Sequence, residues 1–282
     1  MQIVRSVTRM QKLALKLKKQ GKTIALVPTM GALHKGHLEL VARAFRMADI
    51  TVVSIFVNPT QFAPHEDFSR YPRNLALDCK LLRPLGVDIV FHPQPQDIYP
   101  TGFDTYVVPE KIATILDGES RPSHFKGVDT VVLKLFNIVQ PDFAVFGRKD
   151  LQQSVVIKQM VKDLNVPVKI VVAPTVRDAD GLALSSRNAY LSVDARRRAL
   201  VISRSLFAAR QLVLSGERNT AKIRNFVRRQ LVKDAKADVD YVSVADAETL
   251  AELRRISGKI AISLACRIDG VRLIDNVVLK VG

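Results

Sequence analysis

The order of apolar segments constrains the fold of this chain more than any other feature. Up to about residue 175, short apolar runs rich in β-branched residues alternate with segments whose apolar residues recur at helical spacing. Continuous apolar runs are typical of strands buried on both faces, and the alternation of strands with helices predicts a parallel sheet covered by helices. The predicted strands are Ile24–Val27, Ile50–Val57, Val87–Phe91, Phe143–Phe146 and Val168–Val172, and the predicted helices are Leu38–Met47, Leu75–Leu85, Val128–Val139 and Gln152–Leu164.

The pattern changes near Val176. We therefore predict an α/β protein with a Rossmann-like, parallel-sheet nucleotide-binding domain over residues 1–176 and a smaller α+β domain over residues 177–282. A basic amphipathic segment, Met1–Lys19, predicts a further helix that packs on the first domain. In the second domain the predicted helices are Val193–Leu214 and Asn219–Leu231, and the predicted strands are Asp240–Val244, Lys259–Ala265 and Val271–Val278.

Composition narrows the class of protein. Hydrophobic residues make up 48% of the 282, and no window of eighteen residues is both apolar and uncharged, so we expect a globular chain without a transmembrane helix or membrane partner. Cys79 and Cys266 lie far apart in no metal-binding spacing, which favours the cytoplasm. The formal charge of +16 favours anionic partners such as nucleotides. No basic run is longer than Arg196–Arg198, so we expect no specific nucleic-acid binding.

Two histidines stand at the turn between the first predicted strand and the helix after it. His34 and His37 are three residues apart, which places both on one side of the first helical turn. The free N–H groups and the positive dipole at a helix start favour phosphate, and two imidazole donors can stabilise charge on departing pyrophosphate. Gly31 and Gly36 let backbone approach a ligand. Histidines near a turn are often only solvated, so this interpretation needs support from other segments.

Further loops follow the ends of predicted strands, where ligands bind in open parallel sheets. Asn58 and Gln61 offer amides to hydroxyls or a carboxylate, although Asn-Pro also favours a turn by itself. Lys149 precedes a predicted helix, and a positive charge is unfavourable at a helix N-terminus because the helix dipole is positive there. This position therefore indicates that Lys149 binds an anion such as a phosphate of ATP. Ser185–Arg187 offer hydroxyl and guanidinium donors to phosphate. The chain has no G-x-G-x-x-G after the first strand, no P-loop and no G-x-S-x-G, which disfavours dinucleotide, P-loop and serine-hydrolase sites.

Several long motifs occur in one order along residues 22–192. They are Pro28–His37, Ser54–Phe62, Glu66-Asp67, Tyr71–Arg73, Gly86–Asp88, Gly127–Asp142, Gly147–Gln153 and Asp180–Ser192. Together these motifs resemble the pantoate–β-alanine ligase (pantothenate synthetase) family, which belongs to a nucleotidylyl-transferase superfamily. The resemblance is strong over this range and weak over the tail.

The resemblance implies a two-step ligation. The carboxylate of pantoate attacks the α-phosphorus of MgATP, pyrophosphate leaves, and pantoyl adenylate forms. The amine of β-alanine then attacks the acyl carbon, and AMP departs. The implied substrates are pantoate, β-alanine and ATP, the implied metal is Mg²⁺ with unknown ligands, and the implied assembly is a cytoplasmic homodimer.

Residue roles follow from the same motif match. The resemblance implies catalytic roles for His34, His37, Lys149 and Arg187, with His37 as the proton donor. It implies that Gln61 and Gln153 hold pantoate, that Gln61 borders the β-alanine path, and that Asn58 supports the substrate. The implied ATP-binding set is Met30, Gly31, Ala32, Leu33, His34, Lys35, Gly36, His37, Gly147, Arg148, Lys149, Asp150, Val176, Leu184, Ser185, Ser186 and Arg187.

Three positions depart from the family pattern. Arg148 stands where Glu or Gln is usual, Leu184 replaces the usual Met, and Ser123 replaces the usual Gly. A glycine position can require a positive φ, so we expect strain or a shifted loop at Ser123. None of the three changes removes a phosphate donor.

Two other functions share some of these features. A nucleotidyltransferase that makes a stable dinucleotide-like product would share the histidine turn, but the pair of amides at Gln61 and Gln153 suits a small hydroxy acid and favours the ligase. A basic nucleic-acid-binding protein needs an aromatic or Arg-lined face, and the chain has no Trp and only five Tyr.

Overall fold

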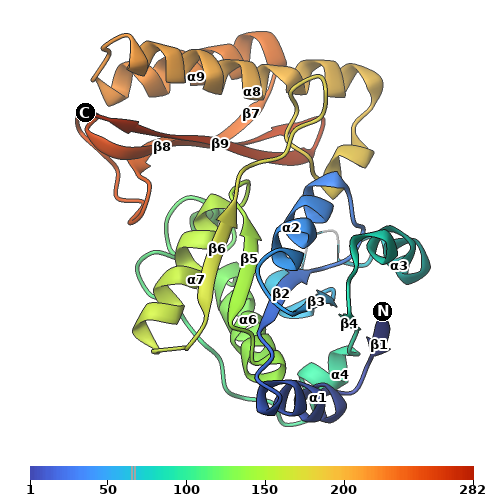
Figure 1. Ribbon diagram of the computed structural model, residues 1–282. Helices are drawn as coiled ribbons and strands as arrows, with labels where there is room; N and C mark the ends of the chain where they lie inside the picture. The colour runs from blue at the N-terminus through green and yellow to red at the C-terminus, as the bar shows by residue number, and fades with distance from the viewer. Residues whose placement is uncertain (65, 67) are drawn as a thin grey trace. The chain divides into compact units, whose positions relative to one another are not determined.

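The computed structural model describes residues 1–64, 66 and 68–282 (Figure 1). Two compact units divide the chain. The first unit comprises Met1–Gly147 and Val156–Pro174, and the second comprises Arg148–Val155 and Thr175–Gly282. The predicted boundary at Val176 lies close to the last of the three breaks, between Pro174 and Thr175. The segment 148–155 belongs to the second unit although it lies within the predicted first domain.

A six-stranded, all-parallel sheet forms the centre of the first unit, as the alternating pattern predicts. Its order is β1-β4-β3-β2-β5-β6. The ends of the five predicted strands shift by one or two residues. The strands are β1 (Gln2–Val4), β2 (Ile24–Thr29), β3 (Ile50–Ile55), β4 (Ile89–Phe91), β5 (Phe143–Gly147) and β6 (Lys169–Ala173).

Helices cover both faces of this sheet. Helices α1 (Val7–Lys19), α6 (His124–Val139) and α7 (Leu151–Asp163) pack on one face, and α2 (Lys35–Phe45) and α3 (Leu75–Leu82) pack on the other. The same part of the chain also contains the short helices α4 (Pro95–Ile98) and α5 (Asp117–Ser120) and the 3₁₀ turns η1 (Pro59–Gln61) and η2 (Arg83–Leu85). No described helix is long and apolar enough to span a membrane.

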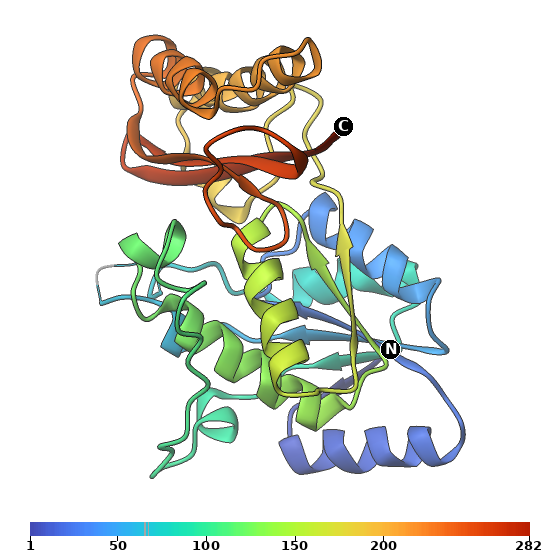
Figure 2. The ribbon, with the colours of Figure 1, turned by 90° about the vertical axis from the view of Figure 1, so that its left-hand side faces the viewer.

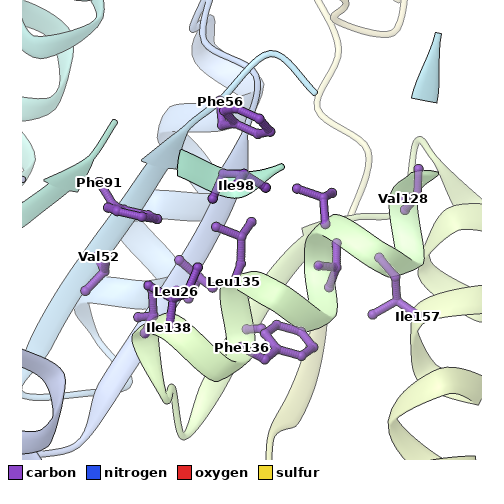
Figure 3. Packing of buried hydrophobic residues seen from close by; sticks show 14 of the residues in the cluster. Leu26, Val52, Phe56, Phe91, Ile98, Val128, Leu135, Phe136, Ile138 and Ile157 are labelled. Atoms are coloured by element: carbon purple, nitrogen blue, oxygen red, sulfur yellow. The ribbon is translucent and has the colours of Figure 1, made fainter. Parts of the chain in front are cut away.

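Alternate residues of each strand enter two separate cores, because side chains of a strand point to opposite faces. Leu26, Val52 and Phe91 pack against α6, where Figure 3 shows them opposite Leu135 and Ile138. The residues between them, including Ala25, Val27 and Val53, pack on the other face with α2 and α3. This two-sided burial explains why the strands read as continuous apolar runs.

The prediction of one helix over Met1–Lys19 is wrong at its start. Gln2–Val4 form β1, which pairs in parallel with β4, and the helix begins only at Val7 after the N-cap Ser6. Val4 is fully buried in the same core as the apolar stripe of α1. A three-residue strand is too short to show a period of two, so its buried residue fits the helical pattern equally well.

The second unit contains an antiparallel sheet and two long helices, which confirms its predicted α+β character. The sheet order is β7-β8-β9, and Figure 2 shows the two helices lying over one face of it. Their apolar sides form one core with the sheet. The elements are η3 (Ser186–Tyr190), α8 (Val193–Leu214), α9 (Thr220–Ala235), β7 (Asp238–Asp246), β8 (Gly258–Ile268) and β9 (Val271–Val281).

Candidate functional site

The histidine turn lies at the carboxyl end of β2 and leads into α2. Gly31 has φ +79°, and a Cβ there would lie 2.9 Å from Asp78 Oδ2 and 3.1 Å from Ile55 Cγ2. Ala32 also has a positive φ, +51°, which is uncommon for a residue with a side chain. The backbone of this turn is therefore held in a compact shape that requires glycine at position 31.

The carboxylate of Asp78 binds the backbone of this turn, a role that the sequence analysis did not predict. Its Oδ1 accepts from Leu33 N at 2.8 Å and its Oδ2 from Ala32 N at 3.2 Å. The side chain is buried, and burial raises its pKa while the two amide donors act in the opposite direction. The sequence did contain a signal: Asp78 lies on the buried side of α3 with Cys79 and Leu82, where an apolar residue is expected.

His34 and His37 form a capping pair at the start of α2. His34 Nδ1 accepts from Gly36 N at 3.1 Å, and His37 Nδ1 accepts from His34 N at 3.4 Å. The ring centroids are 4.1 Å apart. Because both Nδ1 atoms accept, this geometry assigns the proton of each neutral ring to Nε2. Two Nε2–H donors thus stand beside a helix N-terminus, an arrangement suited to binding phosphate.

A second predicted segment joins the histidine turn within the first unit. Gln61 lies in η1, directly after β3, and its Nε2 donates to Met30 Sδ at 3.0 Å. Its Oε1 accepts from Asn58 Nδ2 at 3.2 Å. Both amide side chains are at least nine-tenths buried. Since sulfur is a weak acceptor, the Gln61 N–H donors would gain from a carboxylate or hydroxyl oxygen of a ligand.

A charged cluster, Arg121–Glu66–His124, fixes the backbone of Gln61. His124 Nδ1 lies 2.9 Å from Gln61 O, and Arg121 forms two hydrogen bonds to Glu66, at 2.5 and 2.7 Å. Burial, followed by the charge of Arg121, lowers the pKa of His124 to about 4, so the ring is neutral and donates to the carbonyl. The residues of this cluster show no periodicity from which the sequence could predict it. Asp67, the other residue of the Glu66-Asp67 motif, lies outside the described residues.

The expectation of strain at Ser123 is wrong. Ser123 has φ −91° and ψ −7°, a conformation with negative φ that does not require glycine, and it is the N-cap position of α6. A nearby glycine that packing does require is Gly127, where a Cβ would lie 2.4 Å from Thr60 O. Close approach of η1 to α6 explains this requirement.

Most of the remaining predicted ATP residues lie in the second unit. Asn276 Nδ2 donates to the carbonyls of Arg148 (2.9 Å) and Lys149 (3.0 Å). Lys149 Nζ lies 3.7 Å from Asp150 Oδ1, and 19% of the Lys149 side chain is exposed. Gln153 lies in the first turn of α7. Gly147 ends β5 in the first unit, and a Cβ there would meet no atom within 4 Å, so packing does not dictate glycine at this position.

A second loop of this unit brings Val176 and Leu184 together. Leu184 N donates to Val176 O at 3.0 Å. Ser185 caps η3 by accepting from Arg187 N at 3.3 Å, so the Ser185–Arg187 segment is a defined turn rather than an open loop. In the same loop, Arg177 forms a bidentate ion pair with the buried Asp275, at 2.6 and 2.9 Å. Asp275 and Asn276 are anchors that sequence reasoning missed.

A parallel sheet with a histidine-capped helix start and buried amides at its carboxyl edge defines a nucleotide-binding α/β enzyme. The family model described as pantoate-beta-alanine ligase matches residues 2–278. The chain belongs to the pantoate–β-alanine ligase family.

Individual relatives agree with this assignment. The pantothenate synthetase of Moorella thermoacetica is 49% identical over 282 residues, which is the full length of both chains. A pantothenate synthetase structure from Thermus thermophilus superposes with a TM-score of 0.93 at 42% identity, covering 98% of this chain and 99% of that one. The pantoate-beta-alanine ligase of Francisella tularensis, solved with beta-gamma ATP and beta-alanine, has a TM-score of 0.80 at 38% identity, with coverage of 100% and 99%.

Proposed function

We propose that this chain condenses (R)-pantoate with β-alanine, using ATP, to give pantothenate, AMP and diphosphate. This is a reaction of pantothenate and coenzyme A biosynthesis. Family membership over nearly the whole chain supports the proposal. The single structural observation that carries it is the capping pair His34–His37 beside Gln61, which combines donors for phosphate with an amide for the acid.

In the first step, a carboxylate oxygen of pantoate forms a bond to the α-phosphorus of ATP. The bond from that phosphorus to the oxygen bridging it to the β-phosphate breaks, and diphosphate leaves with the electron pair. The start of α2 and the Nε2–H groups of His34 and His37 would stabilise the charge on the phosphates. From the family resemblance, Lys149 and Arg187 would add positive charge, and His37 is the proposed proton donor.

In the second step, the amine of β-alanine attacks the acyl carbon of pantoyl adenylate. The new carbon–nitrogen bond replaces the bond from that carbon to the phosphate oxygen, AMP departs, and the nitrogen loses a proton. We assign Gln61 and Gln153 to pantoate, with Gln61 beside the path of β-alanine. Adenylation is needed because a free carboxylate is a poor acyl donor.

The remaining assignments extend this proposal. We place the nucleotide against Met30–His37, Gly147–Asp150, Val176 and Leu184–Arg187. Mg²⁺ usually keeps several waters and binds substrate phosphates, so we propose that it enters with ATP; the described residues include no group of three or more His, Cys, Asp or Glu side chains placed to hold a metal. A cytoplasmic homodimer remains a proposal from the family resemblance.

Pantoate-dependent ATP–pyrophosphate exchange tests this function. We expect exchange with pantoate alone, without β-alanine, and we expect His37→Ala to reduce its kcat by a factor on the order of 10²–10³ while leaving the fold intact. Leu38→Ala, at the next position, serves as a control for damage to α2. Exchange that requires β-alanine would contradict the two-step route, and exchange that ignores pantoate would contradict the substrate.

A further inference from the structure

Asn58 has a completely occupied side-chain amide. Its Nδ2 donates to Gly127 O at 3.0 Å and to Gln61 Oε1 at 3.2 Å. Its Oδ1 accepts from Tyr99 Oη at 2.7 Å and from Thr60 Oγ1 at 3.0 Å. Two donor and two acceptor contacts leave this amide little capacity for a substrate. We therefore look for the role of Asn58 in its effect on the neighbouring side chain of Gln61.

The contacts of Asn58 also determine which way its amide faces. A carbonyl oxygen only accepts, so the atom facing Gly127 O is the nitrogen, and the atom facing the two hydroxyls is the oxygen. The nitrogen then donates to Gln61, which forces Gln61 to present Oε1 to Asn58 and to direct Nε2 toward Met30. Gln61 thus offers N–H donors, the groups that an acidic hydroxy substrate requires.

Tyr99 begins this chain of hydrogen bonds. It directly follows α4, and its hydroxyl contacts both Asn58 and, at 3.0 Å, Thr60. The residue before it, Ile98, is buried in the core drawn in Figure 3. Burial raises the pKa of Tyr99 to about 12, so the hydroxyl keeps its proton and donates throughout the neutral range.

We propose that Tyr99 is a positioning residue for the ligation: its hydroxyl orients Asn58, and Asn58 orients the Gln61 carboxamide toward pantoate. This inference rests on the proposed function, since it takes pantoate as the ligand of Gln61. It adds a residue from a segment, the end of α4, that carries none of the predicted site residues. Tyr99 acts through two other side chains and is not itself assigned a contact with substrate.

Tyr99→Phe isolates the hydroxyl. The ring of Tyr99 packs at a centroid distance of 5.1 Å from Phe103 and 6.3 Å from Phe56, and phenylalanine keeps these contacts. Tyr106 provides a matched control, because its ring contacts Phe103 at the same 5.1 Å while none of the four described contacts of the Asn58 amide involves it. Tyr106→Phe should leave the kinetics unchanged.

The measurement is pantoate-dependent ATP–pyrophosphate exchange with the full chain. For Tyr99→Phe we expect kcat/KM for pantoate to fall about three- to tenfold, as the loss of one net hydrogen bond predicts, with the KM for ATP unchanged. In a Gln61→Ala background the same substitution should have no further effect, because residues that act through a shared partner are not additive.

Each outcome decides the matter. Unchanged pantoate kinetics in Tyr99→Phe, or an equal loss in the Gln61→Ala background, would overturn the positioning role. A fall in ATP affinity of the same size as the fall in pantoate kcat/KM would also overturn it, since this pattern indicates general damage. Wild-type chain without pantoate-dependent exchange would instead refute the proposed function, and this inference with it.

Discussion

At the scale of single residues, the surroundings of Asp129 disfavour the charged form of its carboxyl group. It lies in α6, its side chain is fully buried, and neither carboxylate oxygen has a hydrogen-bond partner among the described residues. Burial raises its pKa from 3.8 to about 7. A charge in this position has no hydrogen bond from the described residues to compensate for its lost hydration, so the carboxyl group binds a proton more tightly in the folded chain than in the unfolded one.

The sign of the pH effect follows from that shift. Because the folded state holds the proton more tightly, stability falls as the pH rises from about 4 to about 7, by an amount on the order of 4 kcal/mol, and stays low above that range. We predict that Asp129→Ala raises Tm more at pH 8 than at pH 5. Asp129→Asn keeps the size of the side chain and should remove the same pH dependence. Calorimetric melting at both pH values checks this, and an equal gain at both would contradict it.

At the scale of elements, the histidine turn depends on a helix from elsewhere in the chain. Asp78 reaches from α3 to the amides of Ala32 and Leu33, and Gly31 must lack a side chain to permit that approach. The position of His34 and His37 is therefore set by packing between α2 and α3 as much as by the local sequence.

Asp78→Asn should disturb this turn without removing any histidine. The amide keeps one acceptor oxygen but places an NH₂ group against a backbone N–H. We expect a loss of about 1–3 kcal/mol in unfolding free energy and a fall in exchange kcat on the order of 10- to 100-fold from misplaced histidines. Asp88→Asn is the control, since Asp88 accepts from Thr51 N at 2.8 Å at the amino end of β4. Equal kinetics in the two variants would contradict the anchoring role of Asp78.

Element boundaries show where local sequence stops being informative. The helix predicted from Leu38 begins at Lys35, because its cap is His34, which is not a usual N-cap residue. The helix predicted from Val128 begins at His124. The prediction started too late because Gly127, in the first turn, has a low helix propensity. Glycine is needed at position 127 because the backbone of Thr60 packs closely against it, and the sequence around Gly127 does not predict this tertiary contact. Periodicity found the buried faces, while caps and close contacts depended on the rest of the fold.

At the scale of the whole molecule, motif order predicted the family, and the alternation of apolar runs predicted the sheet. The sequence did not reveal the residues that hold the site residues in place: Asp78, Tyr99, Asp275 and the Arg121–Glu66–His124 cluster. Each is a polar side chain with at least one hydrogen-bond partner that lies more than 30 positions away along the chain. Asp78 has a local signal, its place on the buried side of α3, but its partners, like those of the other residues, come together only in the fold.

The net charge is the other property of the whole molecule. The formal charge of +16 comes from 43 basic and 27 acidic residues. Several of the arginines are paired locally, as Arg196 is with Asp178 and Asp180 and Arg198 with Asp194 and Asp269. Residues 177–282 carry 20 basic and 12 acidic side chains, and the earlier part carries 23 and 15, so the excess is spread along the chain rather than gathered in one stripe.

We predict from this distribution that polyanions bind weakly, without sequence preference, and are released near physiological salt. Binding through phosphate contacts weakens steeply with salt, with a logarithmic slope of about −0.9 for each neutralised phosphate of duplex DNA. Pantoate-dependent exchange should persist under the same conditions, because a Debye length of about 8 Å does little to screen contacts between a bound substrate and the side chains that hold it. Filter binding of tRNA and the exchange assay, both run from about 50 to 200 mM salt, make the comparison. Tight, sequence-selective tRNA binding at the upper salt concentration would contradict the prediction and make nucleic acid a partner of this enzyme.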